Sequence, residues 1–446
     1  MSENKFIQIA EAIERRIDQG EYPVNFKLPP HRTLADELET TPATVAKAYK
    51  LLSEKGRVES FVGRGTFVCG DVTLSQAIQP PEDEKDYNFS ILQPCLYQNV
   101  SPLKMAFEAA SHTLSADLIG YTENSGHETH RRAGVEWGRY FGLEGGNENN
   151  TLLTNGAQHA LSLLINALTK PGDAIAVEAL TYPGILAIAS LSGRQVVAIP
   201  MDEQGMSPSD LDNAILQHDI KAVIVIPSHQ NPTGITMPES RRKEIAKVVN
   251  DNEVWLLEDD IYCFLDQVPL LAVSNYAPDY AFHISGLSKA ISPAMRCGYI
   301  KVPDRQVALI NAHIRANIWL SSPINYIAAT SLIESGEAFN IAAIQRNIAL
   351  ERQKIAREIL TDVDSSASGY HLWIPLPKSW QQERFMMEAK NRGVIVSSGS
   401  YFDASGEGTN HIRLSVMSVS TDQRLKEGLL KLRDLMALNM NTVFPF

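Results

Sequence analysis

Cysteine is scarce in this sequence, and long apolar runs are absent. Four of the 446 residues are cysteines, and none of them forms a C-x-x-C pair, so neither a zinc site nor a disulfide framework is predicted. No stretch approaches the roughly 20 apolar residues that span a bilayer. The first residues, MSENK, also lack the basic and then apolar order of a signal peptide. We therefore expect a cytoplasmic protein without a membrane segment.

An excess of positive charge is also missing, which argues at first sight against binding to nucleic acid. The formal net charge is −12. This charge is unevenly distributed, because residues 1–70 hold ten basic and ten acidic residues and are neutral as a segment. The rest of the chain carries the whole negative excess. Such an asymmetry predicts parts with different partners.

The length predicts two to four domains, and the pattern along the chain separates four segments. We expect a helical module with a hairpin at 1–70, a linker at 71–87, a large α/β domain at 88–330 and a small α+β domain at 331–446. The linker carries two prolines and an acidic cluster. In the large domain, short apolar runs alternate with helical stretches, which predicts a parallel sheet covered on both faces. The runs are 174–179, 195–201, 221–227, 254–260 and 281–286.

The first module has the apolar periodicity of three helices followed by a hairpin. The expected buried positions are Phe6, Ile9, Ala10, Ile13, Ile17, Leu34, Ala35, Leu38, Val45, Ala48, Tyr49 and Leu52. Thr41 is a good N-cap before Pro42, and Thr44 and Lys47 then face outward. The segment RVESFVGRGTFVCG alternates and turns at Gly63–Gly65. This is the pattern of a winged helix-turn-helix that reads a DNA major groove, and a small protein-interaction domain is the alternative.

The segment KLPPHRTLADELETTPATVAKAYKLLSEKGRVESFVGRGTFV resembles the winged helix-turn-helix of GntR-type bacterial regulators, over nearly all of residues 5–68. The resemblance implies DNA contacts by Arg32, Thr41, Thr44, Lys47 and Arg64. Phosphate neutralisation dominates affinity for DNA, so a single neutral module binds weakly. We therefore expect two modules on one double-stranded operator, which requires a homodimer.

Polar residues with the chemistry of a ligand site follow several expected strands of the large domain. TNGAQ (154–158) opens a helix, where backbone N–H groups form an anion site. Tyr182 follows a strand end and can stack on a planar ring. Asn231 follows the run KAVIVIP, and its amide can bind a phenolic oxygen. Asp259, with Asp260 as the competing choice, can hold a pyridine nitrogen in its protonated form. Alone, each of these residues has a structural explanation, such as a turn, a core tyrosine or a helix cap.

Two basic side chains complete this set. Lys289 lies between apolar runs in SGLSKAISPAMRCGY, and a partly desolvated amine there has a lowered pKa and forms Schiff bases. Ser288 and Arg296 of the same segment can bind a phosphate. Arg413 interrupts an apolar C-terminal strand and suits a carboxylate, with a structural ion pair as the alternative.

The order NPTG, EDDIY, SK-x6-R and IRLS resembles the class I, fold-type I aminotransferases over roughly residues 88–440. The resemblance implies pyridoxal 5'-phosphate on Lys289, with Asp259 at the ring nitrogen, Asn231 and Tyr262 at the phenolic oxygen and Tyr182 on the ring. It further implies that Ala157, Gln158, Ser288 and Arg296 hold the phosphate, Tyr121 reaches the phosphate of a neighbouring subunit, and Arg413 holds a substrate carboxylate. Gly286 departs from the family, which commonly has Ser or Thr there, while a serine precedes it at Ser285.

A GntR-like module before an aminotransferase-like domain resembles the MocR subgroup of bacterial regulators. The resemblance implies a cytoplasmic transcription factor that binds pyridoxal phosphate and senses an amino acid or amine, so that operator affinity changes. Two alternatives stay open. One is a working class I aminotransferase with an appended DNA-binding module, since no catalytic position is missing. The other is a sensor for which pyridoxal phosphate itself is the effector.

Overall fold

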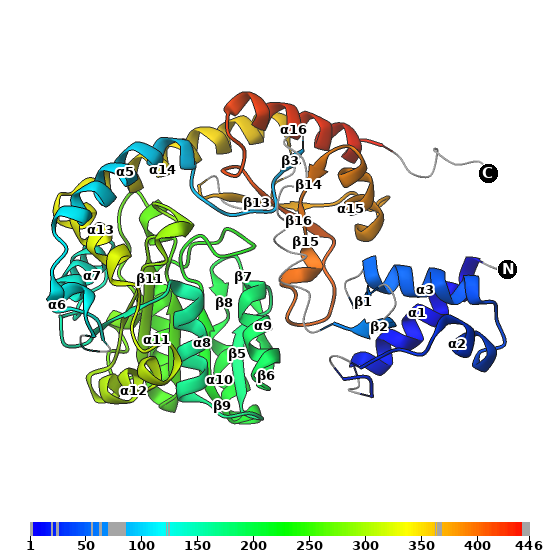
Figure 1. Ribbon diagram of the computed structural model, residues 1–446, viewed down its shortest axis with the longest axis horizontal. Coiled ribbons are helices and arrows are strands. Elements are labelled where there is room, and N and C mark those ends of the chain that lie inside the picture. Colours follow the sequence, from blue (N-terminus) through cyan, green and yellow to red (C-terminus); the bar gives the residue numbers. More distant parts are fainter. Residues whose placement is uncertain are drawn as a thin grey trace. The chain divides into compact units, whose positions relative to one another are not determined.

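The computed structural model describes residues 3–18, 21–23, 26–54, 57–61, 65–69, 86–121, 123, 125–361, 363 and 368–438. The chain divides into two compact units, Met1–Ala77 and Ile78–Phe446, which we name the head and the body (Figure 1). Residues 71–85 of the expected linker and Arg64 at the expected hairpin tip lie outside the described residues.

The described residues of the head form three helices and a pair of antiparallel strands. The elements are α1 (Glu3–Asp18), α2 (His31–Glu37), α3 (Pro42–Glu54), β1 (Val58–Phe61) and β2 (Gly65–Val68). β1 and β2 pair antiparallel, with Val58 opposite Val68. Ile9, Leu34, Val45 and Leu52 share one apolar core, so the predicted stripes of the three helices are confirmed.

One predicted core position of the head is wrong. Leu38 was expected to face inward with Leu34, but 40% of its surface is exposed. α2 ends at Glu37, and Leu38 caps the helix while Glu39 takes a left-handed backbone conformation with φ of 47°. The helical spacing that would place Leu38 inside therefore no longer applies at this residue.

A seven-stranded sheet forms the centre of the body. Its spatial order is β4 (Thr151–Thr154), β12 (Gly298–Lys301), β11 (Ala281–Gly286), β10 (Trp255–Asp259), β9 (Ile220–Val225), β5 (Ala174–Glu178) and β6 (Gln195–Ile199). Neighbours from β11 to β6 are parallel, as predicted. β12 runs antiparallel to both of its neighbours, so the sheet is mixed at this edge.

Helices cover both faces of this sheet because its strands are apolar on both sides. Alternate residues of β9 enter different cores: Ala222 and Ile224 pack toward one face, and Val223 and Val225 toward the other. The first core includes residues of α8 (Ala157–Leu168), α9 (Pro183–Leu191) and α12 (Val307–Asn317). The second includes residues of α10 (Pro208–His218) and α11 (Glu239–Asn252).

A smaller sheet lies in the C-terminal part of the body. β13 (His371–Pro375), β16 (His411–Ser415) and β15 (Ser397–Ser398) pair antiparallel. The helices of this part are α14 (Glu337–Ile359), α15 (Gln382–Asn391) and α16 (Asp422–Met436). Strand β3 (Tyr87–Asn88), at the start of the described body, pairs parallel with β14 (Val394–Ile395). The body therefore begins beside its own C-terminal part, with α14 and α16 side by side (Figure 1).

Several further elements connect these layers. They are α5 (Leu96–His112), α6 (Ala116–Ile119), α7 (Glu128–Tyr140), α13 (Pro323–Glu334), β7 (Met201–Asp202), β8 (Gly205–Met206), η1 (Cys263–Leu265), η2 (Val273–Asn275), η3 (Pro293–Met295), η4 (Asp304–Gln306) and η5 (Gly399–Phe402). Within the described ranges, no helix has the length and apolar character needed to cross a membrane.

Candidate functional site

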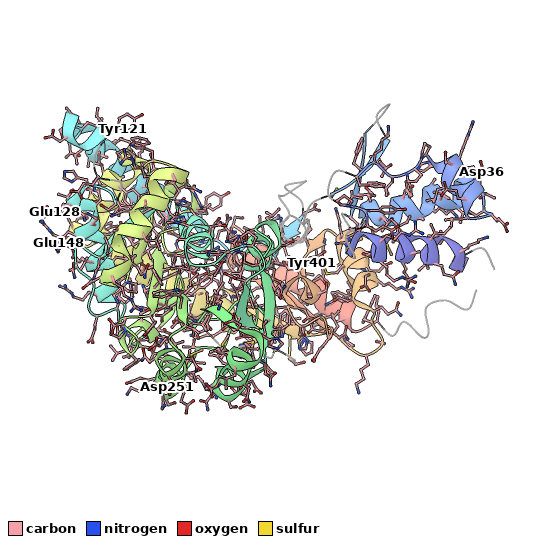
Figure 2. The ribbon with its side chains drawn as sticks, turned by 90° about the horizontal axis from the view of Figure 1, so that it is seen from below. Asp36, Tyr121, Glu128, Glu148, Asp251 and Tyr401 are labelled. Carbon is pink, nitrogen blue, oxygen red and sulfur yellow. The ribbon has the colours of Figure 1, made fainter. Side chains whose placement is uncertain are left out.

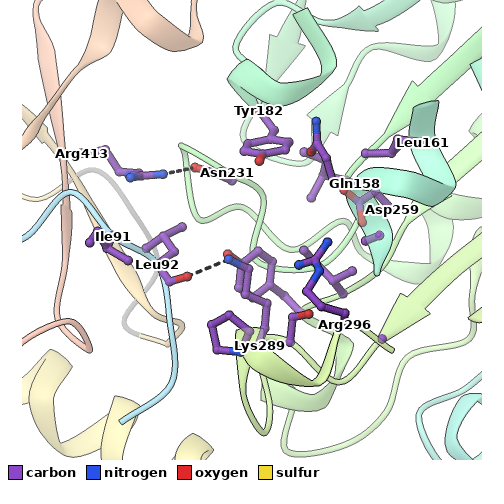
Figure 3. Close-up of a pocket in the computed structure, with 17 residues that line it drawn as sticks. Ile91, Leu92, Gln158, Leu161, Tyr182, Asn231, Asp259, Lys289, Arg296 and Arg413 are labelled. Carbon is purple, nitrogen blue, oxygen red and sulfur yellow. Dashed lines mark hydrogen bonds between the residues drawn. The ribbon is translucent and has the colours of Figure 1, made fainter. Parts of the chain in front are cut away.

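A pocket opens where the parallel strands of the large sheet end, and ten of the eleven predicted ligand residues line it (Figure 3). Its cavity volume is about 160 Å³. The predicted residues that line it are Ala157, Gln158, Tyr182, Asn231, Asp259, Tyr262, Ser288, Lys289, Arg296 and Arg413. The other lining residues are Ile91, Leu92, Leu161, Ile226, Ile261, Gly286 and Pro293. A concave pocket with apolar walls and a few converging polar side chains is typical of a small-molecule site.

One end of the pocket has the form of an anion site. Gly156 is the N-cap of α8 with φ of 79°, and a Cβ at this position would lie 2.9 Å from Nη2 of Arg296. Arg296 thus reaches the helix start only because residue 156 has no side chain. Its guanidinium donates to the carbonyl oxygen of Asn155 at 2.8 Å. The N-terminus of α8 and a guanidinium together favour a phosphate.

Asp259, the last residue of β10, supplies a buried carboxylate. Only 3% of its surface is exposed, and its Oδ1 atom has no hydrogen-bond partner among the described residues. Burial and the charge of Asp260 raise the pKa of Asp259 to about 7. Asp260 does not line the pocket and instead pairs with His283 at 3.5 Å. The geometry therefore selects Asp259 as the carboxylate available to a ligand.

Lys289 follows β11 and extends its amine into the same pocket. Its Nζ atom donates to the backbone carbonyl of Leu92 at 2.7 Å. Tyr370 fixes the backbone of the lysine, because its hydroxyl donates to the carbonyl oxygen of Lys289 at 2.9 Å. Burial, followed by the charge of Arg413, lowers the pKa of Lys289 to about 8. A substantial fraction of this amine is therefore neutral and nucleophilic near physiological pH.

Arg413 lies on β16, on the C-terminal side of the pocket, and 3% of its surface is exposed. It donates to Oδ1 of Asn231 at 3.0 Å, to Oγ of Ser397 at 3.1 Å and to the carbonyl oxygen of Ser90. In the described part of the chain no carboxylate pairs with this guanidinium, and burial lowers its pKa to about 10. An enclosed cation with only neutral acceptors attracts an anionic ligand group.

Hydrogen bonds of the neighbouring residue Gln230 hold the loop that carries Asn231. Gln230 donates to the carbonyl oxygen of Leu180 at 2.6 Å and to Oε2 of Glu178 at 3.2 Å. Nε2 of His371 lies 3.0 Å from the carbonyl oxygen of Gln230. Burial raises the pKa of Glu178 to about 8. These contacts fix the position of Asn231 relative to both sheets.

The departure at Gly286 has a steric cause. A Cβ at this residue would lie 2.8 Å from the backbone carbonyl oxygen of Cys297, the residue before the neighbouring strand β12. Ser285 does not compensate for the missing hydroxyl, because it is buried and does not line the pocket. Among the described residues, Ser288 is the only serine that lines the pocket.

Ile91 and Leu92 are among the seven lining residues outside the predicted set, and one predicted residue is elsewhere. Ile91 and Leu92 line the pocket from the beginning of the body, and no local motif marks them. Tyr121 is 85% exposed at the periphery of the body, where its ring meets Trp319 at 5.5 Å (Figure 2). It is absent from the pocket of its own chain, and its predicted reach to a neighbouring subunit stays a prediction.

Of the predicted DNA-contacting residues that the structure describes, Thr41 precedes α3, Thr44 and Lys47 lie on α3, and Arg32 lies on α2. The hydroxyl of Thr41 accepts from the backbone N–H of Thr44 at 3.2 Å, so the predicted N-cap is confirmed. Arg32, Thr41 and Lys47 are exposed, and Thr44 is half-buried. Their contacts with DNA stay predictions.

Comparisons with known proteins separate the same two parts. Residues 7–68 match the family described as bacterial regulatory proteins, gntR family, and residues 84–432 match aminotransferase class I and II. The HTH-type transcriptional regulator YdeF of Bacillus subtilis is 30% identical over 96% of this chain and 93% of its own. The HTH-type pyridoxine biosynthesis transcriptional regulator PdxR of Corynebacterium glutamicum is 27% identical over 89% of this chain and 88% of its own.

The body also resembles solved structures. A kynurenine aminotransferase from Pyrococcus horikoshii superimposes with a TM-score of 0.73 at 21% identity, over 80% of this chain and 91% of its own. The predicted aminotransferase fold of the body is confirmed.

Proposed function

Because the chain belongs to the MocR-type bacterial regulators, with a gntR-family head and an aminotransferase class I and II body, we propose that it senses an amino acid or amine through pyridoxal 5'-phosphate. The gntR-type head is the DNA-binding part of a transcription regulator. In this proposal, ligand binding in the body changes operator affinity, and the protein acts in the cytoplasm as a homodimer.

The observation that carries the proposal is the convergence of Asp259, Lys289, Arg296 and Arg413 on one pocket. The residues present fit pyridoxal phosphate. The unpartnered Oδ1 atom of Asp259 suits a protonated ring nitrogen, and the space at Gly156 beside Arg296 suits a phosphate. Structural ion pairs do not explain this set, since no carboxylate among the described residues pairs with Arg413.

We assign the following roles to the side chains. Lys289 bonds to the cofactor, Asp259 keeps the ring nitrogen protonated, and Asn231 and Tyr262 bind the phenolic oxygen. Tyr182 stacks on the ring, and Arg413 binds the effector carboxylate. Ala157, Gln158, Ser288 and Arg296 bind the phosphate. When bound, pyridoxal phosphate supplies an electrophilic aldehyde carbon and an electron-withdrawing ring.

The homodimer is supported by an apolar surface of the body. On α5, Tyr97 is 75%, Val100 61% and Met105 66% exposed, and Ile119 of α6 is 59% exposed. Exposed apolar side chains gathered on neighbouring elements mark an interaction surface. A second copy is the occupant that the function requires, because a neutral head needs a partner head to hold an operator. Tyr121 lies in the same region and would then reach the partner.

Two other functions have support of their own. A working aminotransferase is favoured by the lowered pKa of Lys289, about 8, which suits an amine that moves protons near neutral pH. Pyridoxal phosphate as the effector is favoured by the similarity to PdxR, whose name refers to pyridoxine biosynthesis.

Absorbance and DNA footprinting together distinguish these functions. We expect pyridoxal phosphate to give a visible band with the native chain and none with Lys289→Ala. A sensor of amines then shows a stable spectral shift and altered protection of its own upstream DNA, whereas an enzyme releases keto acid. A vitamin sensor changes DNA protection with the cofactor alone. A chain that protects no DNA and turns over amino acids refutes the regulatory proposal.

A further inference from the structure

A short stretch of backbone, Ser90–Leu92, lies between the two cations that the proposed ligands require (Figure 3). Arg413 donates to the carbonyl oxygen of Ser90, and Lys289 donates to the carbonyl oxygen of Leu92 at 2.7 Å. The side chains of Ile91 and Leu92 line the pocket. Each of the two cations therefore has a second function as a donor to this segment.

The segment is fixed on both sides of these contacts. Before it, Oδ1 of Asn88 accepts from the backbone N–H of Ser90 at 3.0 Å and from its hydroxyl at 2.7 Å. Beyond it, the side chain of Gln345 accepts from the N–H of Cys95 at 2.7 Å and donates to its carbonyl oxygen at 3.1 Å. A change at the Ser90 and Leu92 carbonyls thus acts on Asn88 of β3 on one side, while Gln345 holds the chain on the other side.

Ligand binding competes for the same donors. The carbonyl of Ser90 is a neutral acceptor, whereas a carboxylate is negatively charged and binds a guanidinium in two-point geometry, so it competes with Ser90 for Nη2 of Arg413. When Lys289 condenses with an aldehyde, a C=N bond forms and the departing water takes both protons of the neutral amine. The nitrogen then has no N–H for Leu92 unless it takes up one proton from solvent. A buried carbonyl that loses its donor is unfavourable, which drives a rearrangement of the segment.

We propose that Ser90–Leu92 transmits ligand binding from the pocket to the head. The proposal rests on the proposed function, because it requires that Lys289 and Arg413 take up the cofactor and the effector. In the chain, β3 with Asn88 lies between this segment and the boundary of the two units at Ala77 and Ile78. In the proposal, a rearrangement of the segment acts on β3 through the bonds of Ser90 to Asn88, and the carbonyls of Ser90 and Leu92 respond to effector and cofactor separately.

Carbonyl chemical shifts test the two contacts in the full-length protein. Ser90–Ile91 is the only Ser-Ile pair in the sequence, so carbonyl-¹³C serine with ¹⁵N isoleucine labels Ser90 alone. In the same way, carbonyl-¹³C leucine with ¹⁵N glutamine labels two carbonyls, those of Leu92 and Leu216. Leu216 lies on α10 and is an internal control. The probes are pyridoxal phosphate, N-(5'-phosphopyridoxyl)-L-alanine and N-(5'-phosphopyridoxyl)ethylamine. The last differs from the alanine conjugate only by the missing carboxylate.

We expect pyridoxal phosphate to shift the Leu92 carbonyl signal upfield, as loss of a hydrogen bond does. The alanine conjugate shifts Ser90, and the ethylamine conjugate leaves Ser90 in place. Leu216 is unchanged throughout. If absorbance shows bound ligand while Ser90 and Leu92 keep their shifts, the proposal is wrong and the proposed function stands. A chain that takes up neither cofactor nor conjugates refutes the proposed function and, with it, this proposal.

Transmission to the head is tested at Asn88, which lies outside the pocket lining. Asn88→Ala removes the acceptor that holds Ser90, and Asn88→Asp keeps an oxygen there. The DNA used is a sequence selected in vitro for binding to the native chain. We expect the alanine conjugate to change the affinity of the native chain and of Asn88→Asp for this DNA at least about fivefold. In Asn88→Ala the change falls below about twofold, with conjugate binding retained. An undiminished response of Asn88→Ala overturns the proposal, and the carbonyl shifts decide it if that variant does not fold.

Discussion

The Asp259 carboxylate and the Lys289 amine line one pocket, and each favours the charged form of the other. The amine lowers the pKa of Asp259, and the carboxylate raises the pKa of Lys289. In both groups burial has the larger effect and opposes charge, so the pKa of Asp259 is about 7 and that of Lys289 about 8. Modest changes in pH near neutrality therefore alter the charge of both groups.

The first prediction concerns the pH dependence of cofactor uptake. Only the neutral amine attacks an aldehyde, so the uptake rate rises with pH, roughly tenfold per unit below the pKa of Lys289, and levels off above about pH 8. Stopped-flow absorbance with pyridoxal phosphate from pH 6 to pH 10 measures this profile. A midpoint near 10.5, the ordinary value for lysine, would contradict the buried environment described for Lys289.

Asp259→Asn provides the control for this profile. Removing the carboxylate takes away the charge that raises the pKa of Lys289, so the midpoint moves to lower pH. The sign is informative, since a substitution that merely loosened the pocket would hydrate the amine and move the midpoint upward.

The second prediction concerns Gly286. Replacing it by serine, the residue type common in the resembled family, introduces a Cβ 2.8 Å from the carbonyl oxygen of Cys297. Overpacking of this kind costs about 1–3 kcal/mol, so we expect cofactor affinity to fall about tenfold, although a hydroxyl is added. Fluorescence titration with pyridoxal phosphate measures the affinity. Ser285→Ala, beside it and outside the pocket lining, should leave that affinity unchanged, and a tighter Gly286→Ser variant would refute the steric explanation.

The positions of the site residues could be predicted largely because each follows a strand with its own local signal. Asp259 ends an apolar run and Lys289 follows another, and parallel strands bring such ends together. From the residues alone Asp260 stayed a competing choice, because neighbouring strand residues point to opposite faces; the family resemblance favoured Asp259, and it is Asp259 that lines the pocket.

Long-range features could not be predicted in the same way. Ile91 and Leu92 reach the pocket because β3 pairs with β14, more than 300 residues away in the chain, and neither strand carries a motif for that pairing. The antiparallel β12 is not one of the apolar runs found in the sequence, because it has only four residues and begins with Gly298 and ends with Lys301. Leu38 fits the helical spacing, but the helix ends one residue before it.

The third prediction concerns assembly. Met105→Glu places a charge on the exposed apolar face of α5, and we expect it to convert a dimer into a monomer and to weaken operator binding at least about tenfold. Analytical ultracentrifugation measures the first effect and fluorescence anisotropy the second. Leu216→Glu is the matched control, because Leu216 is 74% exposed on α10 and should tolerate a charge. Equal sedimentation of both variants and the native chain would show that α5 is not the dimer surface.

The last prediction concerns the head. Lys47 is exposed one turn beyond Thr44 on α3, and a lysine there neutralises a phosphate when the helix enters the major groove. Lys47→Ala should weaken binding to all DNA sequences alike, and the slope of log affinity against log salt should fall by about 1, because one fewer counterion is released. Lys5→Ala is the control in the same unit, since its amine donates to the carbonyl oxygen of Glu39. A salt slope that is unchanged in Lys47→Ala, or reduced equally by Lys5→Ala, would exclude Lys47 from the DNA-contacting face.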